Sequence, residues 1–459
     1  MLDKMHAVTY HKATINHNNN VYMATEKKTQ QDGNLMLKRV KIQGYKSLED
    51  VEVHLQPLSV FFGPNASGKS NFLDALQLLS RITTSNNLSD AFRHPYRGTP
   101  LESFTFGANG IKELLAKEHM SFTLEADIEV SQRAIDTVSK PTTTDTTFRD
   151  ALENIKNLHQ TIWRYRITIE VQPRSGALNI VDESLNELSL EGEPTTRRIW
   201  MGRDRLDLQW EGGGIRFDSK VNYSMFLTPY YIPLSARIPY WPLLTIHQEL
   251  SNWFIYYPEP RELMRIPSPV REVRLIGLRG EEVDAFLNTL RNLDEPQFKA
   301  IEKALHVIVP SFTGIDVGVN TLGEVELSLM QGQTPISVGA LSEGTLRILG
   351  LLALASMKEP PYLIGIEEPE TGIHPHRLDL IALLLQTRAD DTQVIATTHS
   401  PVLVDLIPKK SLFTFRKVNG KTAIDPLSHL EEQRYKRNSK SDFEGTSTSK
   451  RILRGDFDV

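Results

Sequence analysis

Cysteine is absent from this sequence of 459 residues. The chain can therefore form no disulfide, no thiolate metal site and no cysteine nucleophile. No run of about 18 apolar residues occurs, so we expect no membrane-spanning helix and no membrane partner. The polar N-terminus also lacks the apolar core of a secretory signal, which predicts a cytoplasmic protein.

Neither sign of charge is in large excess. Lys and Arg number 52 and Asp and Glu number 57, which gives a net charge of −5. A mildly acidic chain is not expected to bind nucleic acid over its whole surface, although a local basic patch is still allowed. No heptad run or internal repeat is visible, which argues against a coiled-coil arm. The length suffices for two or three packed regions.

A glycine-rich loop follows a short apolar stretch near the N-terminus. Residues 58–62 (LSVFF) predict a buried strand, and apolar residues recur at helical spacing after Ser70. Between them, residues 63–70 (GPNASGKS) match G-x-x-x-x-G-K-[ST], whose backbone N–H groups cradle phosphates. Lys69 would reach the β- and γ-phosphates, and the Ser70 hydroxyl would bind Mg²⁺. The residues expected at the nucleotide are Gly63, Asn65, Ala66, Ser67, Gly68, Lys69, Ser70 and Asn71.

Three further motifs lie in the last third of the chain. Residues 362–370 (YLIGIEEPE) predict a strand that ends in carboxylates, Glu367 to hold Mg²⁺ and Glu368 to polarise the attacking water. His399 ends the next expected strand, within TTHSP, and is predicted to contact the γ-phosphate. Residues 339–347 (GALSEGTLR) place Ser342 and Gly344 before an apolar helix, where an anion or a simple helix cap fits.

Taken in order, the four motifs resemble those of the ABC-type ATPase heads of the SMC/RecF/OLD group. The nearest resemblance is to single-head bacterial AAA-family ATPases of phage-defence and overcoming-lysogenization systems. It implies an α/β P-loop NTPase with an ABC-ATPase head, whose mixed sheet carries a globular α+β insertion. It also implies ATP and Mg²⁺ as cofactors, and hydrolysis of ATP with Lys69, Glu368 and His399 as catalytic residues.

In that family LSEGT is the signature motif. Ser342 and Gly344 would then contact the γ-phosphate of ATP held by a second subunit, which implies a homodimer or higher homo-oligomer with ATP sandwiched between subunits. Glu367 stands where an Asp is more usual. The resemblance further suggests a D-loop (Gly372, His374 and Pro375), a basic hairpin or plain exposed turn (Tyr45, Lys46 and Ser47), and three alternatives for the Q-loop glutamine (Gln132, Gln160 and Gln172).

These observations divide the chain into five parts. We expect a flexible arm (1–35), the first part of the head with the P-loop (36–84), a middle α+β insertion (85–334), the second part of the head (335–425) and a flexible basic tail (426–459). Within the insertion, residues 121–130 and 163–171 predict strands and residues near 148–160 a short helix. The tail holds seven basic residues. They are expected either to contact the phosphates of a nucleic acid or, as the simpler interpretation, to be solvated.

The leading functional hypothesis is an ATPase whose nucleotide-driven dimerisation gates a separate nuclease or toxin in anti-phage defence. OLD proteins continue into a TOPRIM nuclease, but only 60 residues follow His399 (459 − 399), so we expect another polypeptide to cut nucleic acid. Asp456 and Asp458 form a DxD sequence at the C-terminus, but we expect no fold there that could hold a metal. The alternative is a RecF-like DNA-binding repair ATPase. A transporter subunit is disfavoured by the large insertion.

Overall fold

The computed structural model describes the chain in several stretches. These are residues 7–15, 21–29, 36–139 except 106, 108 and 109, residue 158, 161–218 except 203–204 and 211–212, 224–227, 241–437 except 419, and 447–448. The chain divides into two compact units, residues 1–34 and 35–459. Within the described stretches, no helix is long and apolar enough to cross a lipid bilayer.

The first unit contains an antiparallel hairpin of β1 (Ala7–Ile15) and β2 (Val21–Thr29), in which Ala7 pairs with Thr29 and Ile15 with Val21. The sequence predicted a loose arm here. The strands differ from that expectation because β-branched and aromatic residues recur along both of them, a composition that favours extended backbone.

The second unit is built on a six-stranded sheet that carries the motifs. Its order is β12-β16-β17-β5-β18-β19; the first five strands are parallel and the last is antiparallel. Every residue of β5 and β17 is buried, as expected for a parallel sheet that is covered on both faces. The bounds are β12 (Trp253–Tyr256), β16 (Leu363–Glu367), β17 (Gln393–Thr398), β5 (Leu58–Phe62), β18 (Leu412–Val418) and β19 (Lys421–Pro426).

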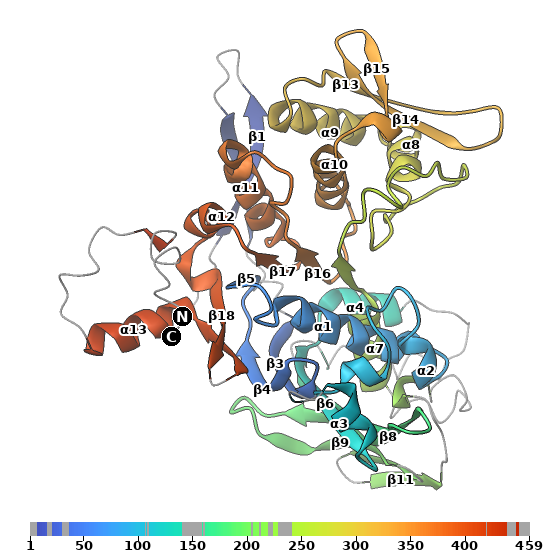
Figure 1. The fold of residues 1–459 in the computed structure, drawn as a ribbon, viewed down its shortest axis with the longest axis vertical. Coiled ribbons are helices and arrows are strands. Elements are labelled where there is room, and N and C mark those ends of the chain that lie inside the picture. Colours follow the sequence, from blue (N-terminus) through green and yellow to red (C-terminus); the bar gives the residue numbers. More distant parts are fainter. Residues whose placement is uncertain are drawn as a thin grey trace. The chain divides into compact units, whose positions relative to one another are not determined.

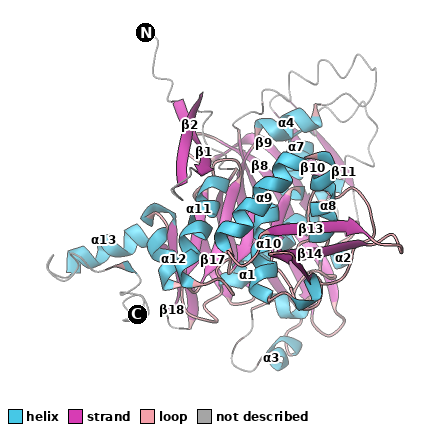
Figure 2. Ribbon diagram, turned by 90° about the horizontal axis from the view of Figure 1, so that it is seen from above, coloured by secondary structure: helices cyan, strands magenta, loops and turns pink. Residues whose placement is uncertain are grey.

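Helices cover the two faces of this sheet. Helix α1 (Lys69–Thr84) packs Phe72 and Leu73 with Phe61 in one hydrophobic core. Helices α10 (Glu343–Ala355) and α11 (Leu378–Arg388) contribute to a second core together with Val60 and Phe62. Figure 1 shows α1 on one side of the sheet and α10 and α11 on the other, and Figure 2 shows the same helices from above. The helix predicted after Ser70 and the apolar helix predicted after the LSEGT motif are confirmed.

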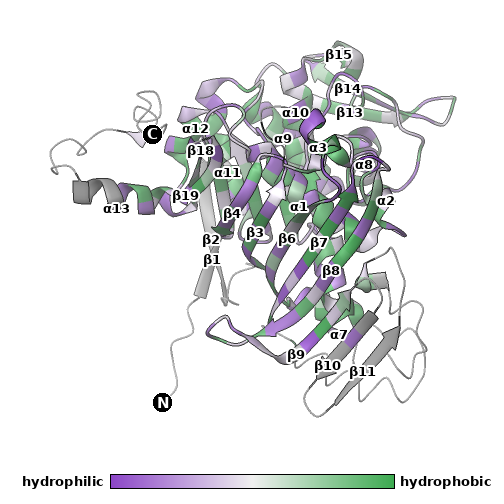
Figure 3. Cartoon of the chain, turned by 60° about the horizontal axis from the view of Figure 1, so that its bottom comes forward, coloured by the Kyte–Doolittle hydropathy of each residue, from purple (hydrophilic) through white to green (hydrophobic). Residues whose placement is uncertain are grey.

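An antiparallel sheet of eight strands packs beside the parallel one, in the order β11-β10-β9-β8-β7-β6-β3-β4. Its inner strands alternate hydrophilic and hydrophobic residues, which is visible along β3, β6 and β7 in Figure 3. The bounds are β3 (Leu37–Tyr45), β4 (Leu48–His54), β6 (Met120–Glu129), β7 (Ile162–Gln172), β8 (Ala177–Leu188), β9 (Pro194–Gly202), β10 (Arg205–Trp210) and β11 (Gly213–Asp218).

The middle region contributes to both sheets. Strand β6 pairs with β3 of the N-terminal part, and β12 pairs with β16 of the C-terminal part. The boundary expected at residue 85 therefore separates strands of one sheet. The strands predicted at 121–130 and 163–171 are confirmed as β6 and β7, whereas the helix predicted near 148–160 lies outside the described residues except for residue 158.

The remaining elements connect these layers. A small antiparallel sheet of β13 (Gly314–Val319), β14 (Val325–Gln331) and β15 (Thr334–Ser337) follows α8 (Val283–Leu293) and α9 (Glu295–Ile308). Short 3₁₀ turns lie at η1 (Leu101–Ser103), η2 (Met225–Leu227), η5 (Val338–Ala340), η6 (Pro375–Arg377) and η7 (Lys409–Ser411). The other helices are α2 (Leu88–Ala91), α3 (Ile111–Leu115), α4 (Gln132–Val138), α7 (Trp241–Ser251), α12 (Pro401–Leu406) and α13 (Leu427–Arg437).

The C-terminal segment differs from the flexible tail that the sequence predicted. It begins with helix α13, whose Leu427 and Leu430 are buried in the same core as β18. These two leucines, three residues apart, give the helix an apolar side, which explains why it docks. Of the basic residues from Arg434 onward, Arg434, Lys436 and Arg437 lie on α13. The others, and Asp456 and Asp458, lie outside the described residues.

Candidate nucleotide site

The parallel sheet aligns the ends of the strands that carry the predicted motifs. Glu367 pairs with Thr397 across β16 and β17, and Thr398 pairs with Phe62 across β17 and β5. Because all three strands run in the same direction, the double glutamate, the His399 loop and the P-loop leave the sheet at one edge. This is the edge at which α/β sheets bind ligands.

The P-loop has the backbone that its sequence predicts. Gly68 has a φ of +108° just before α1 begins, and Ala66 has a φ of 60°, a left-handed conformation that is rare outside glycine. Gly63 has no room for a side chain, because a Cβ there would lie 2.0 Å from the carbonyl oxygen of Phe415. The loop is therefore shaped by close contact with β18 as well as by its own glycines.

Lys69 turns back over this loop. Its Nζ donates hydrogen bonds to the carbonyl oxygens of Gly63 (2.8 Å) and Pro64 (2.9 Å). The residue is 4% exposed, and burial lowers the pKa of Lys69 to about 8, against the opposing charges of Glu368, Glu370 and Glu367. The neighbouring carboxylates offset only part of the cost of burying the positive charge of Lys69. An anion bound beside this lysine is therefore favoured.

Glu368 and His399 meet at the sheet edge. The distance from His399 Nε2 to Glu368 Oε1 is 3.5 Å, and Thr371 Oγ1 donates to Glu368 Oε2 at 3.0 Å. Glu368 has a φ of 46°, a left-handed backbone conformation that is uncommon outside glycine. Burial and the charge of Lys69 lower the pKa of His399, while the neighbouring glutamates oppose that shift. The histidine is therefore held mainly neutral at pH 7, able to accept a hydrogen bond through one ring nitrogen.

Glu370 fixes the histidine loop and was not predicted as a site residue. Its Oε1 accepts hydrogen bonds from Thr398 Oγ1 (2.6 Å), the His399 backbone N–H (2.9 Å) and the Ser400 backbone N–H (3.2 Å). This carboxylate ties the end of β16 to the end of β17. Its place in the sequence, two residues after Glu368, is the only signal that could have identified it.

Arg97 is a second site residue that the sequence did not reveal. Its Nη1 donates to Glu367 Oε2 at 2.7 Å, and its Nη2 lies 2.7 Å from Asp74 Oδ1 on α1. Lys46, in the turn predicted as a basic hairpin, pairs with the other oxygen of Asp74 at 2.7 Å. Arg97 lies in a loop without periodicity, so only the fold brings it to Glu367, 270 residues away.

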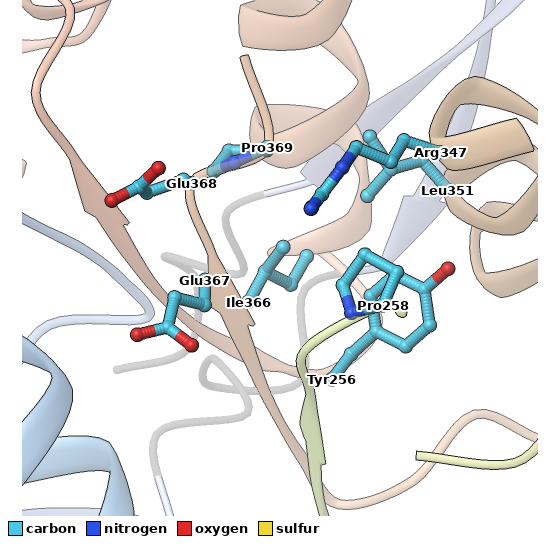
Figure 4. Close-up of a pocket in the computed structure, with 8 residues that line it drawn as sticks. All are labelled: Tyr256, Pro258, Arg347, Leu351, Ile366, Glu367, Glu368 and Pro369. Atoms are coloured by element: carbon cyan, nitrogen blue, oxygen red, sulfur yellow. The ribbon is translucent and has the colours of Figure 1, made fainter. Parts of the chain in front are cut away.

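The residues present suit a magnesium ion bound together with phosphates. Ser70 and Glu367 offer a hydroxyl and a carboxylate, the oxygen ligands that Mg²⁺ prefers, and Mg²⁺ usually takes only one or two protein ligands beside phosphate and water. Within the described part of the chain, no group of three or more His, Cys, Asp or Glu side chains could hold a metal ion by itself. Figure 4 shows Glu367 and Glu368 on one side of the strand end, with Arg347 and Tyr256 on the other side of the pocket that they line.

The predicted signature residues form a separate part of the site. Ser342 caps α10, because its Oγ accepts a hydrogen bond from the Thr345 backbone N–H at 3.2 Å. Gly344 packs directly on the predicted D-loop, since a Cβ there would lie 2.1 Å from the carbonyl oxygen of Gly372. Among the described residues, no hydrogen bond joins Ser342 to the P-loop. His374 caps the following turn, η6, which begins at Pro375.

The Q-loop alternatives stay a prediction. Gln132 begins α4 and bonds Asp136, and Gln172 ends β7 and accepts from Ser175. In the stretches that the structure describes, neither glutamine has a hydrogen bond to the P-loop or to Glu367. Gln160 lies outside those stretches.

Comparison with known proteins gives one extensive family match. The family model described as "AAA domain, putative AbiEii toxin, Type IV TA system" matches residues 58–405. The OLD nuclease of Thermus scotoductus is 41% identical over 408 residues, which are 87% of this chain and 65% of that protein. The DNA replication and repair protein RecF of Bacteroides thetaiotaomicron is 38% identical over 82 residues, 17% of this chain.

The chain thus spans 22% of that RecF and just under two thirds of the OLD nuclease. Among solved structures, an SMC head bound to the C-winged helix domain of ScpA aligns with 86% of this chain and 99% of its own, at 13% identity and a TM-score of 0.48. The SMC head domain from Thermotoga maritima aligns with 85% of this chain and 99% of its own, at 14% identity and a TM-score of 0.37.

Proposed function

Because this chain belongs to that AAA-domain family and is a P-loop ATPase of the SMC/RecF/OLD type, we propose that it binds and hydrolyses ATP at the shared edge of its parallel sheet. One observation carries the proposal. The ends of β5, β16 and β17 bring a buried lysine, a strained glutamate and a histidine together, with Glu368 and His399 3.5 Å apart.

Each side chain has a role that its surroundings support. Lys69 supplies positive charge to the phosphates at the P-loop mouth, and Glu368 orients and deprotonates the attacking water. His399 accepts a hydrogen bond on the same side, in a position that Glu370 fixes through the loop backbone. Ser70 and Glu367 would hold Mg²⁺, which neutralises developing phosphate charge when bound.

We further propose that the site is completed by a second copy of the chain. Ser342 is exposed at the start of α10 and donates to no P-loop atom within the described residues. A helix N-terminus with a free surface suits the γ-phosphate of a nucleotide on another subunit. Through the contact between Gly344 and Gly372, nucleotide binding at one site would then affect the loop that leads back to Glu368.

The biological role proposed is the gating of a partner effector, a nuclease or toxin, in bacterial anti-phage defence. Support comes from the toxin–antitoxin description of the matching family and from the name of the OLD nuclease. A RecF-like repair ATPase that binds DNA is the second candidate, and the local identity to RecF favours it.

Purified chain should release phosphate from ATP in the presence of Mg²⁺, and Lys69→Ala should remove both turnover and ATP binding. Absence of ATP binding by the unmodified, folded chain would overturn the proposed ATPase. Purification from the native host in ATP, followed by mass spectrometry, separates the two roles. A stoichiometric nuclease or toxin supports gating, whereas ATP-dependent, salt-sensitive DNA binding by the chain alone supports the repair role.

A further inference from the structure

The hairpin β18–β19 forms an outer wall of the P-loop. Strand β18 runs parallel to β5, and its last residue paired with β5 is Thr414, opposite Phe62. Lys417 lies three residues further along β18, where it pairs with Thr422 of β19. Strand β19 returns antiparallel and starts with Lys421 and Thr422 at the same edge. The turn of this hairpin therefore stands at the ligand-binding edge, on the side of β5 away from the glutamates.

One threonine joins this hairpin to the P-loop. Thr422 Oγ1 lies 2.9 Å from the carbonyl oxygen of Ser67 and 3.1 Å from that of Ser47. A Cβ on Gly68 would come within 3.1 Å of the same Oγ1. The hydroxyl also accepts a hydrogen bond from Lys417 Nζ at 2.9 Å. Two hydrogen bonds therefore connect the Lys417 ammonium to the backbone of the P-loop.

Lys417 is a cation without a carboxylate partner among the described residues. The nearby Glu49 is paired at 2.7 Å with Lys421, the other lysine of the hairpin. Partial burial lowers the pKa of Lys417, and Glu49 only opposes this shift from a distance. Lys69, on the other side of the loop, also has a lowered pKa, although its side chain is buried and Lys417 is exposed. Uncompensated cations of this kind concentrate where proteins bind anions.

The order of strands decides which part of a nucleotide would reach Lys417. The sheet runs β16-β17-β5-β18, and the hydrolytic side chains Glu368 and His399 follow β16 and β17. With its γ-phosphate towards Glu368, a nucleoside triphosphate would extend away from β16, past β5 and towards the end of β18. The α-phosphate and ribose are therefore the groups that approach the hairpin.

We propose that Lys417 is a nucleotide-binding residue that contacts the α-phosphate or ribose end of an adenine nucleotide, positioned there by Thr422. The inference rests on the proposed nucleotide site and adds a residue from a different strand to it. It also assigns a role to β19, a strand that the sequence did not predict: it supplies the threonine that holds the lysine against the P-loop.

The test is the affinity for ADP, which requires no turnover, measured by isothermal titration with Mg²⁺ on the full chain. Lys417→Met keeps the apolar stem and removes the charge, and it should weaken ADP binding about tenfold, the effect of one lost hydrogen bond to a charged group. Lys417→Arg keeps a positive charge and N–H donors, so its affinity for ADP should stay within about threefold of that of the unmodified chain. Lys421→Met is the matched control, because that side chain is 66% exposed and already paired with Glu49.

The outcomes separate the explanations. ADP binding by Lys417→Met within twofold of the unmodified chain would overturn the inference while leaving the ATPase proposal intact. So would equal losses of affinity in Lys417→Met and Lys417→Arg accompanied by a lowered melting temperature, because that pattern indicates a structural role. An unmodified chain that binds no ADP would instead overturn the proposed function itself, and the inference with it.

Discussion

Glu368 combines a left-handed backbone, with a φ of 46°, and a carboxylate beside a histidine. Non-glycine residues in this conformation cost free energy, and such strain concentrates at functional sites. Here the strained residue directly follows β16, and its carboxylate lies 3.5 Å from His399 Nε2. The backbone conformation is therefore an independent observation in favour of the residue that the sequence identified as the general base.

Glu368→Gln should reduce ATP hydrolysis at least ~100-fold, because an amide cannot accept the proton of the attacking water. ATP binding should persist, since the amide can still accept the hydrogen bond from Thr371. Phosphate release and nucleotide titration measure the two effects separately. Glu432→Gln, on an exposed part of α13, is the control. Normal turnover in Glu368→Gln would remove this residue from the mechanism.

The lowered pKa of Lys69 makes nucleotide binding dependent on pH. Below about 8 the lysine is charged in the free protein, whereas above that value it must take up a proton to bind phosphate. The affinity for ADP should therefore fall between pH 8 and 9.5, with proton uptake that titration calorimetry detects in buffers of different ionisation enthalpy. A constant affinity without proton uptake over this range would contradict the assignment.

The lowered pKa of Lys69 also makes the stability of the folded chain depend on pH, in the direction opposite to its effect on nucleotide affinity. Lys69 titrates near 8 in the folded chain and near 10.5 when unfolded, so the unfolded chain binds more protons between these values. Charged Lys69 thus lowers the free energy of unfolding. This unfavourable contribution becomes smaller as the pH rises from about 8 to 10.5. Nucleotide stabilises the charged form, which is why binding and folding respond to pH in opposite directions.

At the scale of elements, the start of α10 and the predicted D-loop pack backbone against backbone. Gly344→Ala should lower the free energy of unfolding by about 1–3 kcal/mol, because the added methyl would overlap the Gly372 carbonyl. Chemical denaturation measures this change. Gly339→Ala in the preceding turn is the control, since the nearest atom to its Cβ would be 3.9 Å away. Equal free energies of unfolding for Gly344→Ala and Gly339→Ala would contradict this prediction, because they would show that the backbone accommodates the added methyl group without loss of stability.

Secondary structure near the motifs could be predicted from local patterns. The strand at 58–62 and the helix after Ser70 frame the P-loop in the sequence as they do in the structure, because glycines mark the junction. Strands β6 and β7 alternate strictly enough to be recognised. Strand β19 was missed because its six residues show little alternation and gain their stability from pairing with β18.

The contacts that complete the site could not be predicted from local patterns. Arg97 comes from a loop, and its partners Asp74 and Glu367 lie on a helix and a strand at unrelated positions in the chain. Glu370 acts on backbone N–H groups about thirty residues away. Such pairings depend on the three-dimensional fold, whereas motifs depend on spacing along the chain.

At the scale of the whole molecule, a site shared between two copies predicts complementation. Lys69→Ala disables a P-loop, and Ser342→Arg disables a signature turn. Each variant alone should be inactive, but an equimolar mixture should regain ATP hydrolysis, because a mixed dimer contains one site made of two intact halves. Phosphate release measures the effect. A mixture no more active than its components would contradict a site completed in trans.

The order of strands in the parallel sheet also has a consequence during protein synthesis. Strand β5 pairs with β17 and β18, whose residues are translated more than 300 positions later, as in the pair of Leu58 with Val394. At ribosomal rates that interval lasts on the order of 20–70 seconds. Throughout it the P-loop strand lacks both neighbours. A nascent chain therefore has no completed nucleotide site, and chaperones that shield unpaired strand edges have tens of seconds in which to act on it.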